Sequence, residues 1–336
     1  MKRILSGITP SSTKGLHIGN YLGMVKPAVA MQDDGQCYYF VANLHALNTV
    51  FDPKDVMQNT FNIFIEYLAF GIDPTKTIFY VESDIPEITY LQTILNNAVT
   101  VSELKRMHAY KDKLQDNVSP DSIGFGMFSY PMLMAADILA FDIDLVPVGE
   151  DQAQHVEMTR EIAQTFNNRY GNILVVPELS VKKDVARVPG IHGDKKMSKS
   201  LGNDIPIFGT EEEIKKQIMS IKTDPARIHP SDPGNPIKNI AFTYLDLLEY
   251  EKNNENDSLP TLTDMKERYT KGTIGDVEIK KTLYSFFMTY FADMRTKKRE
   301  LMKDIDAIYD IRAQGALKAR KTASKVLDRV KKAVGV

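Results

Sequence analysis

The sequence has little cysteine and no long apolar run, and each shortage excludes a class of protein. The 336-residue chain has a single cysteine, Cys37, so a disulfide within the chain and a cysteine-rich zinc site are both excluded. Its apolar neighbours indicate a buried strand position rather than a ligand site. No apolar run approaches the length of a membrane-spanning helix, and the apolar run before Ser6 and Gly7 is too short for a secretory signal. We therefore expect a cytoplasmic protein, because lone reduced thiols are ordinary there.

Charge of neither sign is in excess. The net charge is −2, so the whole molecule has no electrostatic bias toward nucleic acid. Basic residues do gather after residue 311, where Asp328 is the one acid and the basic residues are Arg312, Lys318, Arg320, Lys321, Lys325, Arg329, Lys331 and Lys332. From charge alone, this segment is either a local patch for nucleic acid or the solvated face of a terminal helix.

Strands and helices alternate in the first part of the chain. Apolar runs broken by glycine and proline predict strands at residues 3–8, 37–42, 77–81 and 141–149. One helix opens at the cap pair Asp52 and Pro53 and ends at Gly71, and another follows Asp151 as its cap and ends at Gly171. This order predicts an α/β fold with a Rossmann-like, doubly wound parallel sheet, whose ligands bind at the carboxyl ends of the strands.

The pattern changes near Thr210, where three glutamates follow a cap-like threonine. Helical segments with charged faces continue from there, and we predict no further strand. The chain has about twice the length of a typical domain. We therefore predict an α/β catalytic domain at residues 1–203 and an all-helical domain at residues 204–336.

The segment Pro10–Asn20 lies between the first strand and the helix after it. Backbone N–H groups at a helix start are arranged to bind phosphate. His17 and Asn20 are three residues apart and share a helical face, while Gly19 leaves room for a flat ligand beside the backbone. The segment fits a nucleotide with its base over Gly19 and its phosphates near His17 and Asn20. An ordinary polar histidine at a helix start is the alternative.

A second segment, Lys195–Asn203, is small, polar and cationic, and it predicts a mobile loop near the domain boundary. Its residues Lys196 to Ser200 would arise by chance about once in 10⁴ chains of this length at average composition. Two lysines on such a loop can close over a polyphosphate and neutralise the charge that grows in a phosphoryl-type transition state. Ordinary surface lysines are the alternative.

Together, His17-Ile18-Gly19-Asn20 and Lys196-Met197-Ser198-Lys199-Ser200 are similar to the paired nucleotide motifs of class I aminoacyl-tRNA synthetases, in the same order and at a fitting separation. Residues 130–139 and 146–160 narrow the match, because they resemble bacterial-type tryptophanyl-tRNA synthetases. The likeness runs from the amino terminus to Asn203, and beyond that residue it is only architectural.

The resemblance implies a binding site for tryptophan. Asp137 would accept the indole N–H of tryptophan, which is a donor only and requires an acceptor; an exposed turn residue is the alternative. The other tryptophan-binding residues would be Met134, Val146 and Val148 around the ring, Tyr130 and Gln152 at the α-amino group, and Leu5 and His45 beside the substrate. A core or capping role for His45 stays open.

The resemblance also implies an ATP site. Gly149, Glu150 and Asp151 would face the ribose and Val188 the adenine, and the remaining ATP-binding residues would be Thr9, Pro10, Ser11, Gly19, Asn20, Lys196, Met197, Ser198, Lys199 and Ser200. The catalytic residues would be His17, Asn20, Lys196 and Lys199. Magnesium would be carried by ATP, and the protein would hold no metal itself.

The sequence also departs from the family pattern. Thr9 stands where glutamine is usual, Leu5 where an aromatic residue is common, and Asn43 where an acid is frequent. The loop at residues 11–15 is longer than the common bacterial form, so the residue that meets the phosphates is shifted. Contacts on that side of the substrate pocket are therefore open.

The implied reaction joins tryptophan to tRNA(Trp) through a tryptophanyl-adenylate, in a homodimer whose helical domain binds the anticodon. Such chemistry needs positioning and charge stabilisation more than a general base. Tyrosyl-tRNA synthetase is the nearest rival, but a phenol both donates and accepts, so its pocket would require a second polar partner. A paralogue that binds RNA or tryptophan as a regulator is another alternative, and the intact Lys196, Lys199, His17 and Asp151 argue against it.

Overall fold

The computed structural model describes residues 1–12, 15–115, 119–181, 188–193, 195–224, 226–229, 231–254 and 259–336, without the side chains of residues 109, 115 and 200. The chain forms two compact units. Unit 1 comprises Met1–Thr13, Ala28–Asp184 and Asp304–Val336, and unit 2 comprises Lys14–Pro27 and Val185–Lys303. This division differs from the predicted one at residue 203, because the last helix belongs with the sheet and residues 14–27 do not.

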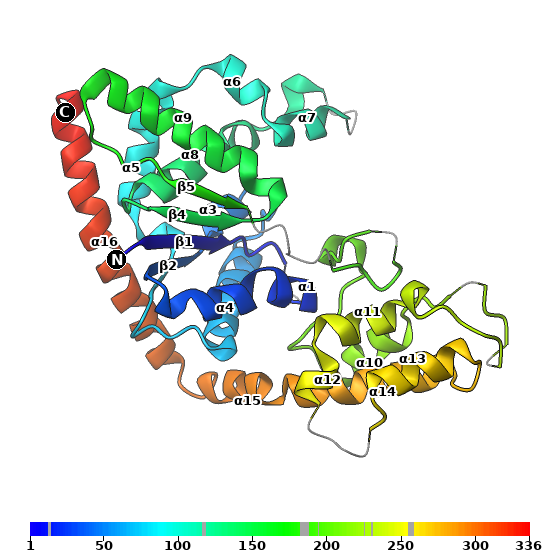
Figure 1. The fold of residues 1–336 in the computed structure, drawn as a ribbon. Coiled ribbons are helices and arrows are strands. Elements are labelled where there is room, and N and C mark those ends of the chain that lie inside the picture. The colour runs from blue at the N-terminus through cyan, green and yellow to red at the C-terminus, as the bar shows by residue number, and fades with distance from the viewer. Residues whose placement is uncertain are drawn as a thin grey trace. The chain divides into compact units, whose positions relative to one another are not determined.

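Unit 1 is built on a five-stranded parallel sheet with the order β3-β2-β1-β4-β5 (Figure 1). The strands are β1 (Arg3–Ile8), β2 (Gln36–Val41), β3 (Ile78–Val81), β4 (Leu145–Val148) and β5 (Glu178–Val181). The strand order reverses between β1 and β4, and ligands of such sheets bind at this switch point. The predicted α/β fold with a parallel sheet is confirmed.

Two predictions for the strands need correction. The strand predicted at residues 141–149 begins only at Leu145, because Asp142 has a left-handed φ of 51° that turns the chain before the strand. The edge strand β5 was not predicted. It is short and includes Glu178 and Ser180, so it lacks the apolar run by which the other strands were recognised.

Helices cover both faces of the sheet. Phe79 and Tyr80 of β3 point to opposite faces because side chains alternate along a strand. Phe79 stacks on Phe64 of α4 with ring centroids 4.2 Å apart, whereas Tyr80 belongs to a core with residues of α5, α8, α9 and α16. The helices of unit 1 are α3 (Asn43–Ala46), α4 (Pro53–Phe70), α5 (Pro86–Leu95), α6 (Val101–Lys105), α7 (His108–Gln115), α8 (Phe125–Leu139), α9 (Ala153–Tyr170) and α16 (Ile305–Val334), while α2 (Lys26–Ala30) crosses the division between the units.

The predicted helix caps are confirmed at α4 and in part at α9. Asp52 accepts a hydrogen bond from the backbone N–H of Lys54 at 2.8 Å, and Gly71 ends α4 with a φ of 109°. Gly171 ends α9 as predicted. Asp151 does not cap that helix, because it lies within a 3₁₀ turn over residues 150–152 and its carboxylate instead accepts from Gln152 Nε2 at 3.2 Å.

The basic carboxyl-terminal segment forms α16, which packs on the rest of unit 1. Small and apolar residues recur every three or four positions on its buried face: Gly315, Ala319, Ala323, Val326 and Val330. A Cβ on Gly315 would lie 1.7 Å from the carbonyl oxygen of Phe79, so only glycine permits this approach to β3.

Three arginines of α16 pair with acids of unit 1. Arg312 binds both oxygens of Asp84 at 2.6 Å, Arg320 binds Glu87, and Arg329 binds Asp142. These three arginines thus belong neither to a patch for nucleic acid nor to a freely solvated face. They anchor the helix to the unit that carries the sheet.

Unit 2 is helical. Its helices are α1 (Ile18–Asn20), α10 (Glu211–Met219), α11 (Ile240–Leu247), α12 (Tyr250–Asn253), α13 (Leu262–Thr270), α14 (Asp276–Tyr290) and α15 (Ala292–Leu301). Thr210 caps α10 through a reciprocal pair of hydrogen bonds with Glu213, as the sequence predicts. Among the described residues of this unit there is no strand, and none of the chain's described helices is long and apolar enough to cross a membrane.

Candidate active site

Helix α8 brings three of the predicted tryptophan-binding residues to one face. Tyr130, Met134 and Asp137 follow each other at a spacing of four and then three, which places them on one side of a helix. Asp137 is only 1% exposed, so the alternative of an exposed turn residue is wrong. A carboxyl group buried to this degree requires partners for its polar atoms.

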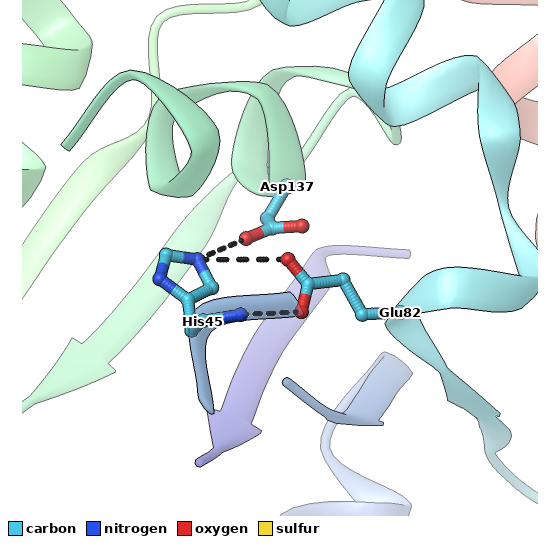
Figure 2. Close-up of side chains that lie close together, drawn as sticks. All are labelled: His45, Glu82 and Asp137. Carbon is cyan, nitrogen blue, oxygen red and sulfur yellow. Dashed lines mark hydrogen bonds and ion pairs between the residues drawn. The ribbon is translucent and has the colours of Figure 1, made fainter. Parts of the chain in front are cut away.

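His45 is one such partner. It follows β2 on the short helix α3, and its Nε2 lies 3.0 Å from Asp137 Oδ2 (Figure 2). The second oxygen, Asp137 Oδ1, is buried and has no hydrogen-bond partner among the described residues. Burial raises the pKa of Asp137 well above its usual value. Asp137 thus offers one acceptor oxygen that the described protein groups do not use.

Glu82 is the third member of this cluster, and the sequence did not point to it. It directly follows β3, whose end lies beside the end of β2, and its Oε2 accepts from the backbone N–H of Leu44 at 2.8 Å. Its Oε1 lies 3.6 Å from His45 Nε2 (Figure 2). Burial and the nearby charge of Asp137 raise the pKa of Glu82 to about 8.

These three side chains place ligand atoms within 4.8 Å of one another, which is the spacing of a metal site. All three side chains already take part in hydrogen bonds, since His45 Nε2 bonds to Asp137 Oδ2 and Glu82 Oε2 accepts from the backbone N–H of Leu44. We therefore treat His45, Glu82 and Asp137 as a hydrogen-bonded cluster, called the acid–histidine cluster below, and assign no metal to it.

A second polar pair lies beside this cluster. The Tyr130 hydroxyl is 3.0 Å from Nε2 of His155, and the Tyr130 ring meets His45 edge-on with centroids 6.0 Å apart. Burial, aided by the charge of His45, lowers the pKa of His155 to about 4, so its imidazole is neutral at physiological pH. His155 lies within the sequence block that resembles the family, but no role was predicted for it.

The apolar residues predicted to surround the ring also lie in unit 1. Leu5, Val146, Val148 and Met134 belong to, or pack against, the same hydrophobic core as Tyr80. Gln152 lies in the 3₁₀ turn before α9 and is half-buried, and its side-chain amide donates to Asp151. The structure thus joins His45, Tyr130 and Asp137 by direct contacts, places the apolar set in the adjoining core, and shows Gln152 bound to Asp151.

In unit 2, the His17–Asn20 motif forms a closed capping box. The backbone N–H of Asn20 donates to His17 Nδ1, and the backbone N–H of His17 donates to Asn20 Oδ1, both at 3.2 Å. His17 therefore caps α1. From the spacing we expected it to project from the face of the helix, and that expectation was wrong. Burial and the positive charges of Lys199 and Lys196 lower the pKa of His17 to about 3, which keeps the imidazole neutral.

The two nucleotide motifs meet within unit 2. A Cβ on Gly19 would lie 3.0 Å from the His17 ring and 3.4 Å from Met197 Cβ, so glycine lets the motifs approach each other. The backbone N–H of Ile18 donates to Ile205, which follows the second motif in sequence. Lys196 is exposed and Lys199 is half-buried, while Met197 is buried.

Asn203 holds the second motif in its folded form. Its Oδ1 accepts from the backbone N–H of Ser198 at 2.7 Å, and its amide nitrogen lies 3.4 Å from the carbonyl oxygen of Lys196. A Cβ on Gly190 would lie 2.1 Å from that amide nitrogen. Ser198, in the segment expected to be a mobile loop, is thus hydrogen-bonded to a buried side chain.

The remaining predicted ATP residues belong to both units. Thr9, Pro10 and Ser11 follow β1, and Gly149, Glu150 and Asp151 follow β4, so both sets lie at carboxyl ends of strands in unit 1. Val188 lies in unit 2, where its carbonyl oxygen accepts from the backbone N–H of Met197. Of the longer loop at residues 11–15, positions 13 and 14 lie outside the described residues, as does the Ser200 side chain.

A parallel sheet with its switch point beside β1, together with the two motifs that meet at Gly19, defines a class I tRNA synthetase. The sequence family described as tRNA synthetases class I (W and Y) matches residues 1–292. The chain belongs to the tryptophan–tRNA ligases of this family, as the following similarities show.

Two curated relatives match along their whole length. The tryptophan–tRNA ligase of Fusobacterium nucleatum subsp. nucleatum is 41% identical over 337 residues, which cover 100% of this chain and 98% of that protein. The enzyme of Rhodopirellula baltica is 40% identical over 334 residues, with 99% of each chain covered. The crystal structure of the Campylobacter jejuni tryptophanyl-tRNA synthetase with ADP and tryptophan matches with a TM-score of 0.89 at 39% identity, covering 99% of this chain and 100% of that one.

Proposed function

We propose that this chain activates L-tryptophan with ATP and then transfers it to tRNA(Trp). The observation that carries the proposal is Asp137 Oδ1, a buried acceptor without a partner among the described residues. A group of this kind costs about 1–3 kcal/mol when unpaired, and the indole N–H supplies the missing donor. The relatives named above, which are tryptophan–tRNA ligases, support the same conclusion.

In the first step, a carboxylate oxygen of tryptophan forms a bond to the α-phosphorus of ATP. The bond from that phosphorus to the bridging oxygen of the β-phosphate breaks, and pyrophosphate leaves with the electron pair. In the second step, a hydroxyl of the terminal tRNA ribose attacks the carbonyl carbon of the adenylate, and AMP leaves. Because the substrate carboxylate is already a nucleophile, the first step requires charge stabilisation and positioning but no general base.

On the phosphate side, Lys196 and Lys199 supply positive charge to the pyrophosphate as it leaves. The neutral His17 binds phosphate oxygens as a hydrogen-bond donor without adding a charge that would strengthen ground-state binding of ATP. In this proposal Asn20 completes the capping box that orients the His17 ring. Magnesium is carried by the phosphates of ATP, and no protein ligand is assigned to it.

On the tryptophan side, Asp137 reads the indole N–H, and Met134, Val146 and Val148 contact the ring. Tyr130 and Gln152 hold the α-amino group, and Leu5 lies beside the substrate. His45 acts through Asp137, since its Nε2 engages the other carboxylate oxygen at 3.0 Å. The adenosine of ATP is assigned to Thr9–Ser11, Gly149–Asp151, Gly19 and Val188.

For the macromolecular partners, we propose a homodimer that binds tRNA(Trp) in the cytoplasm, with the helices of unit 2 at the anticodon. Exposed apolar side chains support the dimer: Phe51 is 83% and Phe125 is 76% exposed. Their segments adjoin, since a Cβ on Gly126 would lie 2.7 Å from Asn48 Oδ1. Phe125→Lys should convert a dimer to a monomer in sedimentation equilibrium, and a wild-type monomer would refute this part.

Amino-acid-dependent exchange of pyrophosphate into ATP tests the catalytic proposal. Run across all twenty amino acids, the assay should show exchange with tryptophan and not with tyrosine or phenylalanine. Equal or greater exchange with tyrosine would assign the chain to the tyrosine enzymes of the same family. Exchange with no amino acid would indicate a binding protein without charging activity.

A further inference from the structure

The acid–histidine cluster contains two carboxyl groups where reading an indole N–H requires one. Asp137 is 1% exposed and Glu82 is 0% exposed, and they reach the same place from α8 and from the end of β3 (Figure 2). Two buried carboxylates beside one imidazole would carry more charge than the imidazole can neutralise. The cluster therefore retains a proton on one of its carboxyl groups.

Hydrogen bonding decides which carboxyl group keeps the proton. His45 Nε2 can donate one hydrogen bond, and the shorter distance is 3.0 Å to Asp137 Oδ2, against 3.6 Å to Glu82 Oε1. That bond stabilises charge on Asp137. Glu82 Oε2 accepts from the backbone N–H groups of Leu44 and His45 at 2.8 and 3.4 Å, and the carbonyl oxygen of a neutral acid can accept both. Glu82 Oε1 has no hydrogen-bond partner among the described residues, and it is the oxygen on which the proton fits.

We propose that Glu82 is a positioning residue of the tryptophan site, held as a neutral acid so that the neighbouring Asp137 is the charged group that reads the indole N–H. This inference rests on the proposed function. Glu82 also supports His45 directly, because its Oε2 accepts from the His45 backbone. The pocket thereby presents one negative charge to a donor-only ligand.

Other titratable groups face the cluster, but they do not change charge in the pH range in which Glu82 ionises. Burial lowers the pKa of His45, and the pKa of His155 lies at about 4. The pKa of Tyr130 is raised to about 12 and that of Tyr80 well above its usual value, chiefly by burial. Asp151 raises the pKa of His155, but burial has the larger effect. Between pH 7 and 9, the group that changes charge is therefore Glu82, whose pKa is raised to about 8.

Tryptophan should bind the protonated cluster more tightly. In this proposal the hydrogen bond from His45 keeps the charge on Asp137 whether or not Glu82 is ionised, so the indole N–H does not distinguish the two states. The bound ring excludes water, however, and makes a second buried charge more costly. Binding therefore takes up a proton above the pKa of Glu82, and affinity falls by up to about tenfold per pH unit there.

The test is calorimetric titration of the full chain with tryptophan at pH 6.5 and 8.5, in buffers of different ionisation enthalpy. The wild type should take up a proton at pH 8.5 and none at pH 6.5. Glu82→Gln is an isostere of the neutral acid, so it should bind tryptophan within about twofold of the wild type at pH 6.5 and take up no proton at pH 8.5. The amino group of free tryptophan titrates equally in all titrations, so the difference between the proteins reports the cluster.

Two further variants make the result decisive. Glu87→Gln removes a neighbouring acid that binds Arg320, and it should keep the wild-type proton uptake. Asp137→Asn removes the charge that helps to raise the pKa of Glu82, so proton uptake at pH 8.5 should vanish there too. A tenfold or greater loss of affinity in Glu82→Gln at pH 6.5, or unchanged proton uptake in it at pH 8.5, would overturn the inference while leaving the enzyme's substrate intact. Failure of the wild type to bind tryptophan would overturn the proposed function and the inference together.

Discussion

Replacing Asp137 by asparagine tests the indole contact with little change in shape. The asparagine carbonyl can still accept from the indole N–H, and its amide can face His45 if the imidazole adopts its other tautomer. What is lost is the charge on the acceptor. A hydrogen bond to a charged group is worth about 1.5–3 kcal/mol, so tryptophan affinity should fall by about 10- to 150-fold. ATP affinity should remain unchanged, because Asp137 is assigned no contact with the nucleotide.

Tryptophan affinity can be measured by fluorescence titration. The chain itself contains no tryptophan, so all indole fluorescence comes from the ligand. Asp137→Ala should lose at least as much affinity and should narrow the preference for tryptophan over phenylalanine, because the buried acceptor that penalises phenylalanine is gone. Asp142→Asn is the matched control: it is an acid-to-amide change in the same unit, and the ion pairs it alters are those with Arg3 and Arg329. If both Asp137 variants bound tryptophan with an affinity within twofold of the wild type, the proposed hydrogen bond from the indole N–H to Asp137 would be refuted.

Three further predictions concern the phosphate site and the last helix. Lys196→Ala and Lys199→Ala should each slow adenylate formation by about 10²–10³ in single-turnover assays while tryptophan binding is kept; unchanged rates would make these lysines ordinary surface groups. Because the pKa of His17 is about 3 in the folded chain and near 6.5 when unfolded, stability should fall as pH decreases from 6.5 toward 3, by up to about 1.4 kcal/mol per pH unit. His17→Asn keeps a helix cap and should weaken this dependence in denaturant titrations, whereas an identical slope would contradict the burial of a neutral imidazole. Gly315→Ala should destabilise unit 1 by at least about 1–3 kcal/mol, because its Cβ would overlap the carbonyl oxygen of Phe79, and an unchanged melting temperature would refute the tight contact.

Local signals in the sequence were sufficient at α4, where the physical cause acts within one helical turn. Asp52 and Gly71 fix the ends of α4 through their own conformations and nearest hydrogen bonds, so their types alone predict the helix. The left-handed turn at Asp142 has no such signature, because aspartate adopts that conformation only in particular surroundings. The predicted strand was therefore too long at its beginning.

The acid–histidine cluster shows why the site could be predicted only in part. Asp137 was found because a donor-only ligand requires an acceptor and because its surrounding segment resembles the family. Glu82 was missed, since an acid after a strand is typical of an exposed turn. Its burial depends on β2 and β3 lying side by side, with their ends in register, which brings Glu82 to His45. Pairing the polar residues that follow neighbouring strands would have found it.

The arginines of α16 illustrate the same limit. Their charge is plain in the sequence, but their partners Asp84, Glu87 and Asp142 belong to segments far earlier in the chain. No charge count distinguishes an arginine that binds a phosphate from one that binds a distant carboxylate.

The docking of α16 on the sheet also bears on how the protein is made. Unit 1 consists of three stretches of chain separated by the segments of unit 2, so a ribosome has synthesised residues 1–304 before residues 305–334 emerge. Until then, β3 lacks the helix that packs against its backbone at Gly315, and an exposed strand edge is a template for aggregation. The contact that covers β3 therefore forms only after residues 305–334 have been translated.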